Sequence, residues 1–325
     1  MPLKPSFNIV NDAEFNTTAL SLFDFQYHQN LVYREFCGYL GKNRSNVQRI
    51  EDIPFLPISF FKTKKVVCGS FSSDIVFTSS GTTGNEVSRH YVRDLNVYEQ
   101  SYLTAFKQFY GPIEDYCILA LLPSYLEREG SSLIYMADDL IKKSKHPDSG
   151  FYLDHIDHLY STLIRLETTD TKILLLGVSF ALLDMAEKFQ LNLRNTVIME
   201  TGGMKGRRKE MIREELHQIL KVGFGVSHIH SEYGMTELLS QAYSLGNGRF
   251  TTPNWMKVLT RETGDPLTLQ EPEKTGGINI IDLANVHSCA FIATQDLGKV
   301  HGDGSFEISG RFDHSDIRGC NLMVL

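Results

Sequence analysis

The sequence has little that would place the chain in a membrane, in an oxidising compartment or on nucleic acid. Its longest apolar run, around Ile118 to Leu122, has the length of a strand, and the N-terminus lacks the apolar core of a signal peptide. Five scattered cysteines without a C-x-x-C pair disfavour a disulfide framework and a zinc site. The net charge of −7 disfavours a nucleic-acid partner. We therefore expect a cytoplasmic protein with no membrane insertion and no bound nucleic acid.

Alternating strand and helix patterns predict an α/β fold with a largely parallel sheet. Helical patterns cover residues 11–50 and 207–222, and Asp94 is placed to cap a further helix whose aromatic residues form a core-facing stripe. The remaining expected elements are strands: 116–122, 172–176 and 196–199, followed by shorter ones in a β-rich segment at about 245–310. Ligands of such sheets bind beyond the carboxyl ends of the strands, where Gly202 and Gly203 occur.

A run of hydroxyl residues and glycines follows the short apolar segment Ile75 to Phe77. It reads Ser79, Ser80, Gly81, Thr82, Thr83, Gly84. Glycines let the backbone approach a ligand, successive N–H groups form an anion-binding concavity, and hydroxyls add donors without bulk. The run therefore indicates a phosphate-binding loop, although clusters of this composition are also common in plain surface loops. It lacks the G-x-x-x-x-G-K-[ST] pattern of a P-loop.

A second motif, Tyr-Gly-Met-Thr-Glu, spans residues 233–237. The ring of Tyr233 can stack on an adenine, Gly234 permits close approach, and the Thr236 hydroxyl can reach a phosphate. Glu237 offers a hard oxygen of the kind that Mg²⁺ takes alongside substrate phosphates. Taken alone, such a string is also an ordinary turn at the end of a strand.

Together, the loop and this motif resemble the carboxylate-adenylating superfamily of acyl-CoA synthetases, adenylation domains and luciferases. The resemblance implies ATP and Mg²⁺ as cofactors, and it implies that Asp296, within Ala-Thr-Gln-Asp-Leu-Gly, binds the ribose hydroxyls. Residues 310–319 resemble the family's G-R-x-D hinge motif, which places Arg311 near ribose and phosphate and Asp313 at the hinge. The family's loop usually ends in a lysine. Here either Arg89 replaces that lysine or the cation is missing.

Among these families, the acyl-protein synthetases of bacterial luminescence operons are most similar to this chain. The resemblance implies an adenylation domain over 1–310 and a hinge-like segment with a short tail over 311–325, without the superfamily's C-terminal domain and its lysine. In that family a cysteine near the C-terminus carries the acyl group, a role that falls here to Cys320. A thiolate is the attacking form of cysteine, and an acyl-adenylate is a good electrophile for it.

The expected reaction is therefore ATP-dependent activation of a carboxylic acid, with a fatty acid implied by the resemblance. Transfer to a thiol follows, and an acyl reductase or acyltransferase is the implied protein partner. The sequence leaves open the acid, the oligomeric state and whether CoA replaces Cys320 as the acceptor, as in an acyl- or aryl-CoA ligase.

Two alternatives belong to other classes. Gly177-Val178-Ser179-Phe180-Ala181 has nearly the G-x-S-x-G form of a nucleophile elbow, which would make Ser179 the nucleophile of a serine acyl hydrolase. Ser179 suits a helix N-cap equally well. The missing lysine also permits a non-catalytic remnant that binds nucleotide.

Overall fold

The computed structural model describes residues 5–79, 87–123, 130–202 and 211–312. The chain divides into two compact units. Unit 1 joins Met1–Ser72 to Asn254–Leu325, and unit 2 is Ser73–Pro253. The N-terminal segment thus folds with the β-rich C-terminal segment, an association of distant parts that the local sequence pattern did not reveal. Among the described residues, no helix combines the length and the apolarity needed to cross a bilayer.

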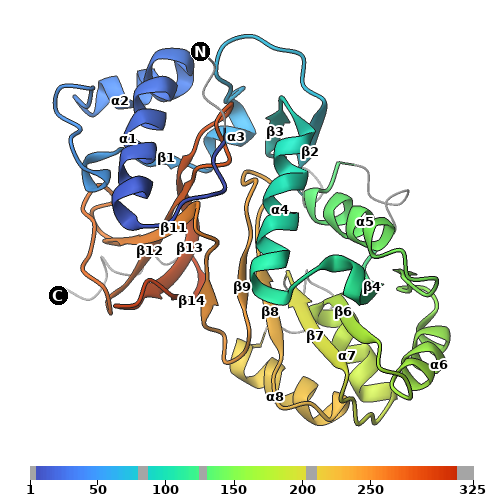
Figure 1. Ribbon diagram of the computed structural model, residues 1–325. Helices are drawn as coiled ribbons and strands as arrows, with labels where there is room; N and C mark the ends of the chain where they lie inside the picture. Colours follow the sequence, from blue (N-terminus) through green and yellow to red (C-terminus); the bar gives the residue numbers. More distant parts are fainter. Residues whose placement is uncertain (1–4, 80–86, 124–129, 203–210, 313–325) are drawn as a thin grey trace, which may run out of the picture. The chain divides into compact units, whose positions relative to one another are not determined.

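Unit 1 is an antiparallel sheet with helices beside it (Figure 1). The sheet has the order β11 (Met256–Arg261), β12 (Thr275–Asp282), β13 (Phe291–Val300) and β14 (Phe306–Arg311), and β1 (Leu56–Pro57) pairs in parallel with β13. The helical elements are α1 (Asp12–Gln29), α2 (Leu31–Tyr39), η1 (Ile50–Asp52) and α3 (Phe60–Thr63). Gln26 on α1 donates to the carbonyls of Asn285 and Val286 at 2.8 and 3.0 Å, which ties the helix to the segment between β12 and β13.

The helical prediction over residues 11–50 is correct only as far as Tyr39. Asn30 separates α1 from α2, and its side chain accepts from the Tyr33 N–H at 3.0 Å as the N-cap of α2. Beyond α2, Gly41 has φ +64°, and the Asn43 N–H donates to the Asn46 side chain at 2.8 Å. Asparagine side chains that bond the local backbone compete with a helix, so the chain turns here.

Unit 2 contains a mixed sheet in the order β10-β9-β8-β7-β6-β4-β5. Its parallel part is β4 (Tyr116–Leu121), β5 (Gly150–Phe151), β6 (Lys172–Val178), β7 (Thr196–Thr201) and β8 (His230–Tyr233). The antiparallel part adds β9 (Ala242–Ser244) and β10 (Phe250–Thr251), and β2 (Ile75–Thr78) and β3 (Arg89–Val92) form a separate hairpin. The predicted α/β class with largely parallel strands is confirmed.

The helices of unit 2 connect these strands. They are α4 (Leu95–Tyr110), η2 (Ile113–Asp115), α5 (Ser132–Ser144), α6 (Ile156–Leu166), α7 (Ser179–Lys188) and α8 (Arg213–Phe224). Asp94 caps α4 as predicted, accepting from the Asn96 N–H at 3.0 Å. The predicted stripe of α4 is core, since Tyr98, Tyr102 and Phe106 are buried.

The helix predicted over 207–222 begins later, at Arg213, with Ile212 as its N-cap. The apolar spacing places Met211, Ile212, Leu216, Ile219 and Leu220 on one face of this helix. Leu216 and Leu220 are buried as predicted, together with Phe224, but Ile212 is 68% exposed and Ile219 is 36% exposed. A helix that starts at 213 places Ile212 outside its apolar stripe.

Candidate functional site

The Ser/Gly/Thr loop connects the two strands of the β2–β3 hairpin. Two hydrogen bonds join Ser79 to Ser88 at the base of the loop. The Ser79 N–H donates to the Ser88 carbonyl at 3.2 Å, and the Ser79 hydroxyl accepts from the Ser88 N–H at 3.0 Å. Thr78 pairs with Arg89, which is exposed at the start of β3. Residues 80–86, which include Ser80, Gly81, Thr82, Thr83 and Gly84, lie outside the described residues.

His90 links this hairpin to the second motif. Its side chain is buried on β3, and Nδ1 lies 2.8 Å from the Thr236 carbonyl oxygen. A carbonyl can only accept, so Nδ1 carries the proton. The contact joins the base of the Ser/Gly/Thr loop to the Tyr-Gly-Met-Thr-Glu turn within one unit. The sequence did not indicate His90, because a lone histidine in a strand carries no local signal of such a role.

The second motif begins at the end of β8, as expected for a ligand site on a parallel sheet. Tyr233 is the last residue of the strand, and its ring centroid lies 5.8 Å from that of Phe250. At Gly234 a Cβ atom would lie 2.4 Å from Glu232 Oε1, so a larger residue would displace that carboxyl. Glycine at this position therefore leaves room for the Glu232 carboxyl.

Glu232, directly before Tyr233, has a strongly raised pKa. The Thr201 hydroxyl donates to its Oε2 at 2.6 Å. Burial raises the pKa of Glu232 to about 7, against the lowering effect of the Thr201 hydrogen bond, and the charge of Glu200 raises it further. A carboxyl that titrates near neutrality therefore lies next to Tyr233, a feature that the motif itself does not indicate.

Glu237 is 5% exposed. Among the described residues, no group of three histidine, cysteine or acidic side chains could hold a metal ion. Magnesium bound with a nucleotide does not need such a group, because it takes one or two carboxylates and completes its shell with phosphate oxygens and water. A single buried carboxylate at the end of the motif fits that mode of binding.

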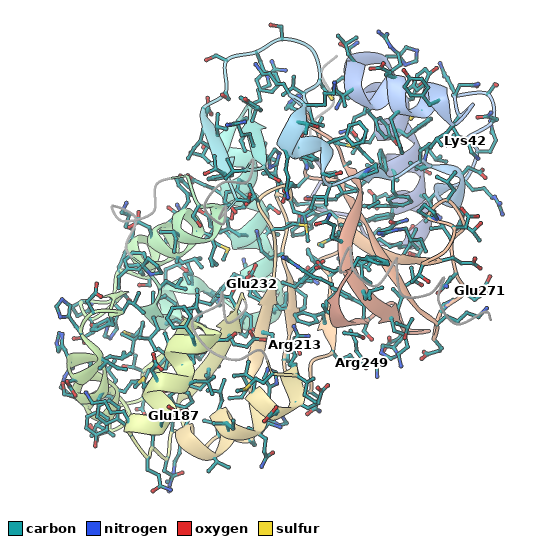
Figure 2. The ribbon with its side chains drawn as sticks, turned by 180° about the vertical axis from the view of Figure 1, so that it is seen from behind. Lys42, Glu187, Arg213, Glu232, Arg249 and Glu271 are labelled. Atoms are coloured by element: carbon teal, nitrogen blue, oxygen red, sulfur yellow. The ribbon has the colours of Figure 1, made fainter. Side chains whose placement is uncertain are left out.

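The end of β7 is held by a buried polar network. The Ser179 hydroxyl donates to the Gly202 carbonyl at 2.7 Å and lies 3.4 Å from Glu200 Oε2. Arg213, labelled in Figure 2, lies near the second carboxylate oxygen of Glu200. Glu200 Oε1 lies 3.5 Å from Arg213 Nε and 3.6 Å from His217 Nε2. Burial would raise the pKa of Glu200, but the bond from His217 and the charge of Arg213 lower it overall. This network anchors Gly202, which has φ +68°.

The same network argues against a hydrolase. Ser179 is 2% exposed and bonds Gly202, whereas an elbow nucleophile is exposed at the end of its strand. His217 faces both Ser231, at 3.5 Å, and Glu200 with the same atom, Nε2, whereas a triad histidine uses its two nitrogens for serine and acid. The N-cap interpretation is also wrong, because Ser179 is the first residue of α7 and Val178 is the cap.

Gly177 has a packing role instead. A Cβ atom there would lie 2.8 Å from Leu182 Cγ and 3.0 Å from Leu121 Cβ. The glycine therefore lets α7 approach β6 closely, which accounts for the elbow-like spacing without catalysis.

Unit 1 holds the other predicted residues. Asp296 on β13 is 5% exposed and pairs in register with Arg311 on β14. Arg311 Nε donates to Asp296 Oδ1 at 3.0 Å, from a side chain that is 81% exposed. Asp313 and Cys320 lie outside the described residues, as does Gly203 of unit 2. The structure thus brings Asp296 and Arg311 together in unit 1, and the Ser79 hairpin and Thr236 together in unit 2.

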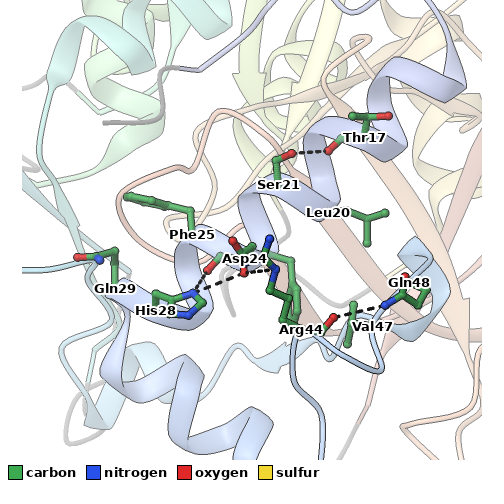
Figure 3. Close-up of a pocket in the computed structure, with 11 residues that line it drawn as sticks. Thr17, Leu20, Ser21, Asp24, Phe25, His28, Gln29, Arg44, Val47 and Gln48 are labelled. Carbon is green, nitrogen blue, oxygen red and sulfur yellow. Dashed lines mark hydrogen bonds and ion pairs between the residues drawn. The ribbon is translucent and has the colours of Figure 1, made fainter. Parts of the chain in front are cut away.

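A surface pocket of unit 1 lies between α1 and residues 44–48 (Figure 3). Its described lining contains none of the motif residues. Asp24 Oδ1, inside the pocket, lies 3.4 Å from Arg44 Nε and 3.5 Å from His28 Nδ1. Because this pocket is lined by none of the motif residues, we take the strand-end motifs as the candidate site.

Comparison with known proteins bears on the fold of the chain. No family model matches the chain. The solved structure of a 2-hydroxyisobutyryl-CoA ligase in an open conformation, with 2-HIB-AMP and CoA, has a TM-score of 0.69 and 11% identity over 97% of this chain and 76% of its own. ATP-bound MatB from Rhodopseudomonas palustris has a TM-score of 0.56 and 15% identity over 74% of this chain and 49% of its own.

A curated protein is also similar over a shorter stretch. The long-chain-fatty-acid–luciferin-component ligase of Vibrio harveyi is 42% identical over 65 residues, which is 19% of this chain and 16% of the ligase. The match covers about half of the MatB chain, 49%, and 16% of the luciferin-component ligase. The predicted resemblance in fold is confirmed: the chain has the fold of the adenylate-forming enzymes.

Proposed function

We propose that the chain activates a carboxylic acid with ATP and transfers the acyl group to a thiol. The observation that carries the proposal is the contact of His90 with the Thr236 carbonyl, which joins the hairpin of the phosphate-type loop to the Tyr-Gly-Met-Thr-Glu turn. The fold of enzymes whose structures hold ATP or an acyl-AMP supports the same conclusion.

In the first step a carboxylate oxygen of the acid forms a bond to the α-phosphorus of ATP. The bond from that phosphorus to the bridging oxygen breaks, and pyrophosphate leaves. Residues 79–84 hold the leaving phosphates, Thr236 the α-phosphate, and Gly202 and Gly203 border the nucleotide. Tyr233 and Gly234 contact the base side, and Asp296 with Arg311 bind the ribose. Catalysis here is positioning and charge neutralisation.

Magnesium, held by Glu237, would neutralise the phosphate charge as it does in other nucleotide sites. The buried position of Glu237 limits competing water at that oxygen.

In the second step a thiolate attacks the acyl carbonyl carbon, and AMP leaves with the C–O bond electrons. Four of the five cysteines are unsuited to this role. Cys37, Cys68, Cys117 and Cys289 are buried. Burial raises the pKa of Cys37 and Cys68 to about 12 and that of Cys117 to about 11, and it also raises the pKa of Cys289 well above its usual value. Cys320 is therefore the acceptor we propose within this chain.

The acid we propose is a fatty acid, on the strength of the partial match to a long-chain-fatty-acid ligase. An acyl-enzyme thioester then requires a consumer, for which an acyl reductase or acyltransferase is the suitable class of partner. CoA as the acceptor is the second candidate, favoured by the CoA in the 2-hydroxyisobutyryl-CoA ligase structure.

The test is intact mass spectrometry after incubation with ATP, Mg²⁺ and a panel of fatty and aryl acids. We expect an added acyl mass that neutral hydroxylamine removes and that Cys320→Ser abolishes. Cys68→Ala, a buried cysteine, is the control and should keep the adduct. Release of AMP and pyrophosphate without an adduct would support CoA or another protein as the acceptor. No ATP consumption with any acid would contradict the proposal.

A further inference from the structure

Asp296 lies in a break of the β12–β13 ladder. The two strands pair at Gly277↔Leu297 and again at Asn279↔Ala293. Between these pairs one residue of β12, Ile278, faces three of β13, which are residues 294–296. Extra residues on one strand form a bulge, which disrupts the ladder and turns a side chain out of its regular direction. The direction of the Asp296 carboxylate therefore depends on what holds this bulge, as well as on Arg311, whose Nε donates to Oδ1 at 3.0 Å.

Arg261, at the end of β11, spans the bulge. Its side chain is almost fully buried, with the residue 6% exposed. The NH1 group donates to the Ile278 carbonyl at 2.6 Å and to Asn279 Oδ1 at 2.8 Å, and the NH2 group donates to the Thr294 carbonyl at 2.6 Å. The planar fork of a guanidinium can bridge two strands in this way, whereas a lysine has a single nitrogen. Arg261 thus replaces the missing ladder bonds.

The bridge continues from Thr294 to Asp296. The Thr294 hydroxyl donates to the Ile278 carbonyl at 2.9 Å and accepts from the Asp296 N–H at 3.1 Å. Space for Arg261 depends on Gly277, where a Cβ atom would lie 2.6 Å from the guanidinium carbon. These contacts form a continuous chain from the guanidinium to the Asp296 backbone.

The charges of Arg261 and Asp296 also interact across the bulge. Burial lowers the pKa of Arg261 to about 10, and the charge of Asp296 opposes this effect. The guanidinium therefore stays charged at neutral pH, close enough to Asp296 for their charges to interact. A buried cation is tolerated when hydrogen bonds and a nearby anion compensate it. Arg261 and Asp296 compensate each other across the bulge.

We propose that Arg261 is a positioning residue that aims Asp296 at the ribose hydroxyls of a bound nucleotide. This inference rests on the proposed function, in which Asp296 binds ribose. It assigns to Arg261, Gly277 and Thr294 the selection of ribonucleotides over nucleotides that lack the 2′- and 3′-hydroxyls.

The experiment measures the affinities of the full chain for ATP and for 2′,3′-dideoxyATP by calorimetry, and compares their ratio. Hydrogen bonds to a charged group support a preference of about 10- to 100-fold for ATP in the wild type. Asp296→Ala should bring the ratio close to one. Arg261→Met should do the same while leaving the affinity for 2′,3′-dideoxyATP largely unchanged. A general loosening of unit 1 would instead weaken both nucleotides equally.

Two further variants keep the test decisive if Arg261→Met does not fold. Arg261→Lys keeps the charge without the fork, and Gly277→Ala keeps the arginine but displaces it; both should lower the ratio. Lys257→Met is the matched control on β11, since it removes the pair with Asp12, at 2.7 Å, and the Lys257 contact with the Phe15 ring, but none of the Arg261 contacts, and it should keep the wild-type ratio.

The outcomes separate the two proposals. A ratio that Asp296→Ala abolishes but that all three Arg261 and Gly277 variants retain would overturn the inference and leave the proposed function standing. A wild type that binds ATP without any preference over the dideoxy analogue would also overturn it, by removing the ribose role of Asp296. A wild type that binds no ATP would overturn the proposed function, and the inference with it.

Discussion

Glu232→Gln should change how stability depends on pH. Glu232 lies directly before Tyr233, where burial raises its pKa to about 7 from an ordinary 4.5. Glutamine keeps an oxygen that can accept the Thr201 hydroxyl, so the substitution mainly removes the titration. Figure 2 shows this side chain among those of unit 2.

The magnitude follows from proton linkage. A carboxyl with a raised pKa binds its proton more tightly in the folded state, so the free energy of unfolding falls as the pH rises from about 4.5 to about 7. A difference between 4.5 and about 7 corresponds to roughly 3 kcal/mol, an upper bound because part of the side chain reaches solvent. Well below pH 4.5 the group is protonated in both states and contributes nothing.

His230 titrates in the opposite sense. Burial, with a contribution from His228, lowers its pKa to about 4 from 6.5, so it adds stability as the pH rises through that range. This contribution is the same in the wild type and in Glu232→Gln, and it cancels in their difference. The difference between the two proteins therefore isolates Glu232.

The assay is urea unfolding of both proteins at pH 5 and pH 8. Relative to the wild type, Glu232→Gln should gain up to about 3 kcal/mol between these pH values. Glu214→Gln, an exposed residue in the first turn of α8, should track the wild type. Parallel pH dependence of the wild type and Glu232→Gln would refute the reasoning, since it would mean that Glu232 ionises as an ordinary carboxyl.

Two further predictions concern the proposed reaction. His90→Phe leaves the Thr236 carbonyl without its donor, at a cost of about 1–3 kcal/mol, and should weaken ATP–pyrophosphate exchange by roughly 5- to 100-fold. His90→Asn, which can still donate, should retain more activity; equal losses in both would count against the contact. Glu237→Gln should raise the Mg²⁺ concentration for half-maximal exchange by about tenfold, because a charged oxygen ligand becomes neutral. An unchanged Mg²⁺ dependence would exclude Glu237 as the ligand.

Local patterns in the sequence predicted the elements and the order of the motifs. The strands at β4, β6 and β7 and the helix capped by Asp94 lie where the apolar periodicity placed them. The Ser/Gly/Thr run and Tyr-Gly-Met-Thr-Glu follow β2 and β8, at strand ends. These features depend on residues that are close in the sequence, so a single sequence is enough to recognise them.

Other features depended on contacts between residues far apart in the sequence. Only the tertiary structure placed residues 1–72 with the strands after residue 254, brought His90 to Thr236, and set Arg261 across the bulge that holds Asp296. The tertiary structure also showed that α8 begins at Arg213 and that the buried Ser179 bonds to Gly202. Contacts between residues far apart in the sequence decide such features, and local apolar periodicity carries no information about which distant residues meet.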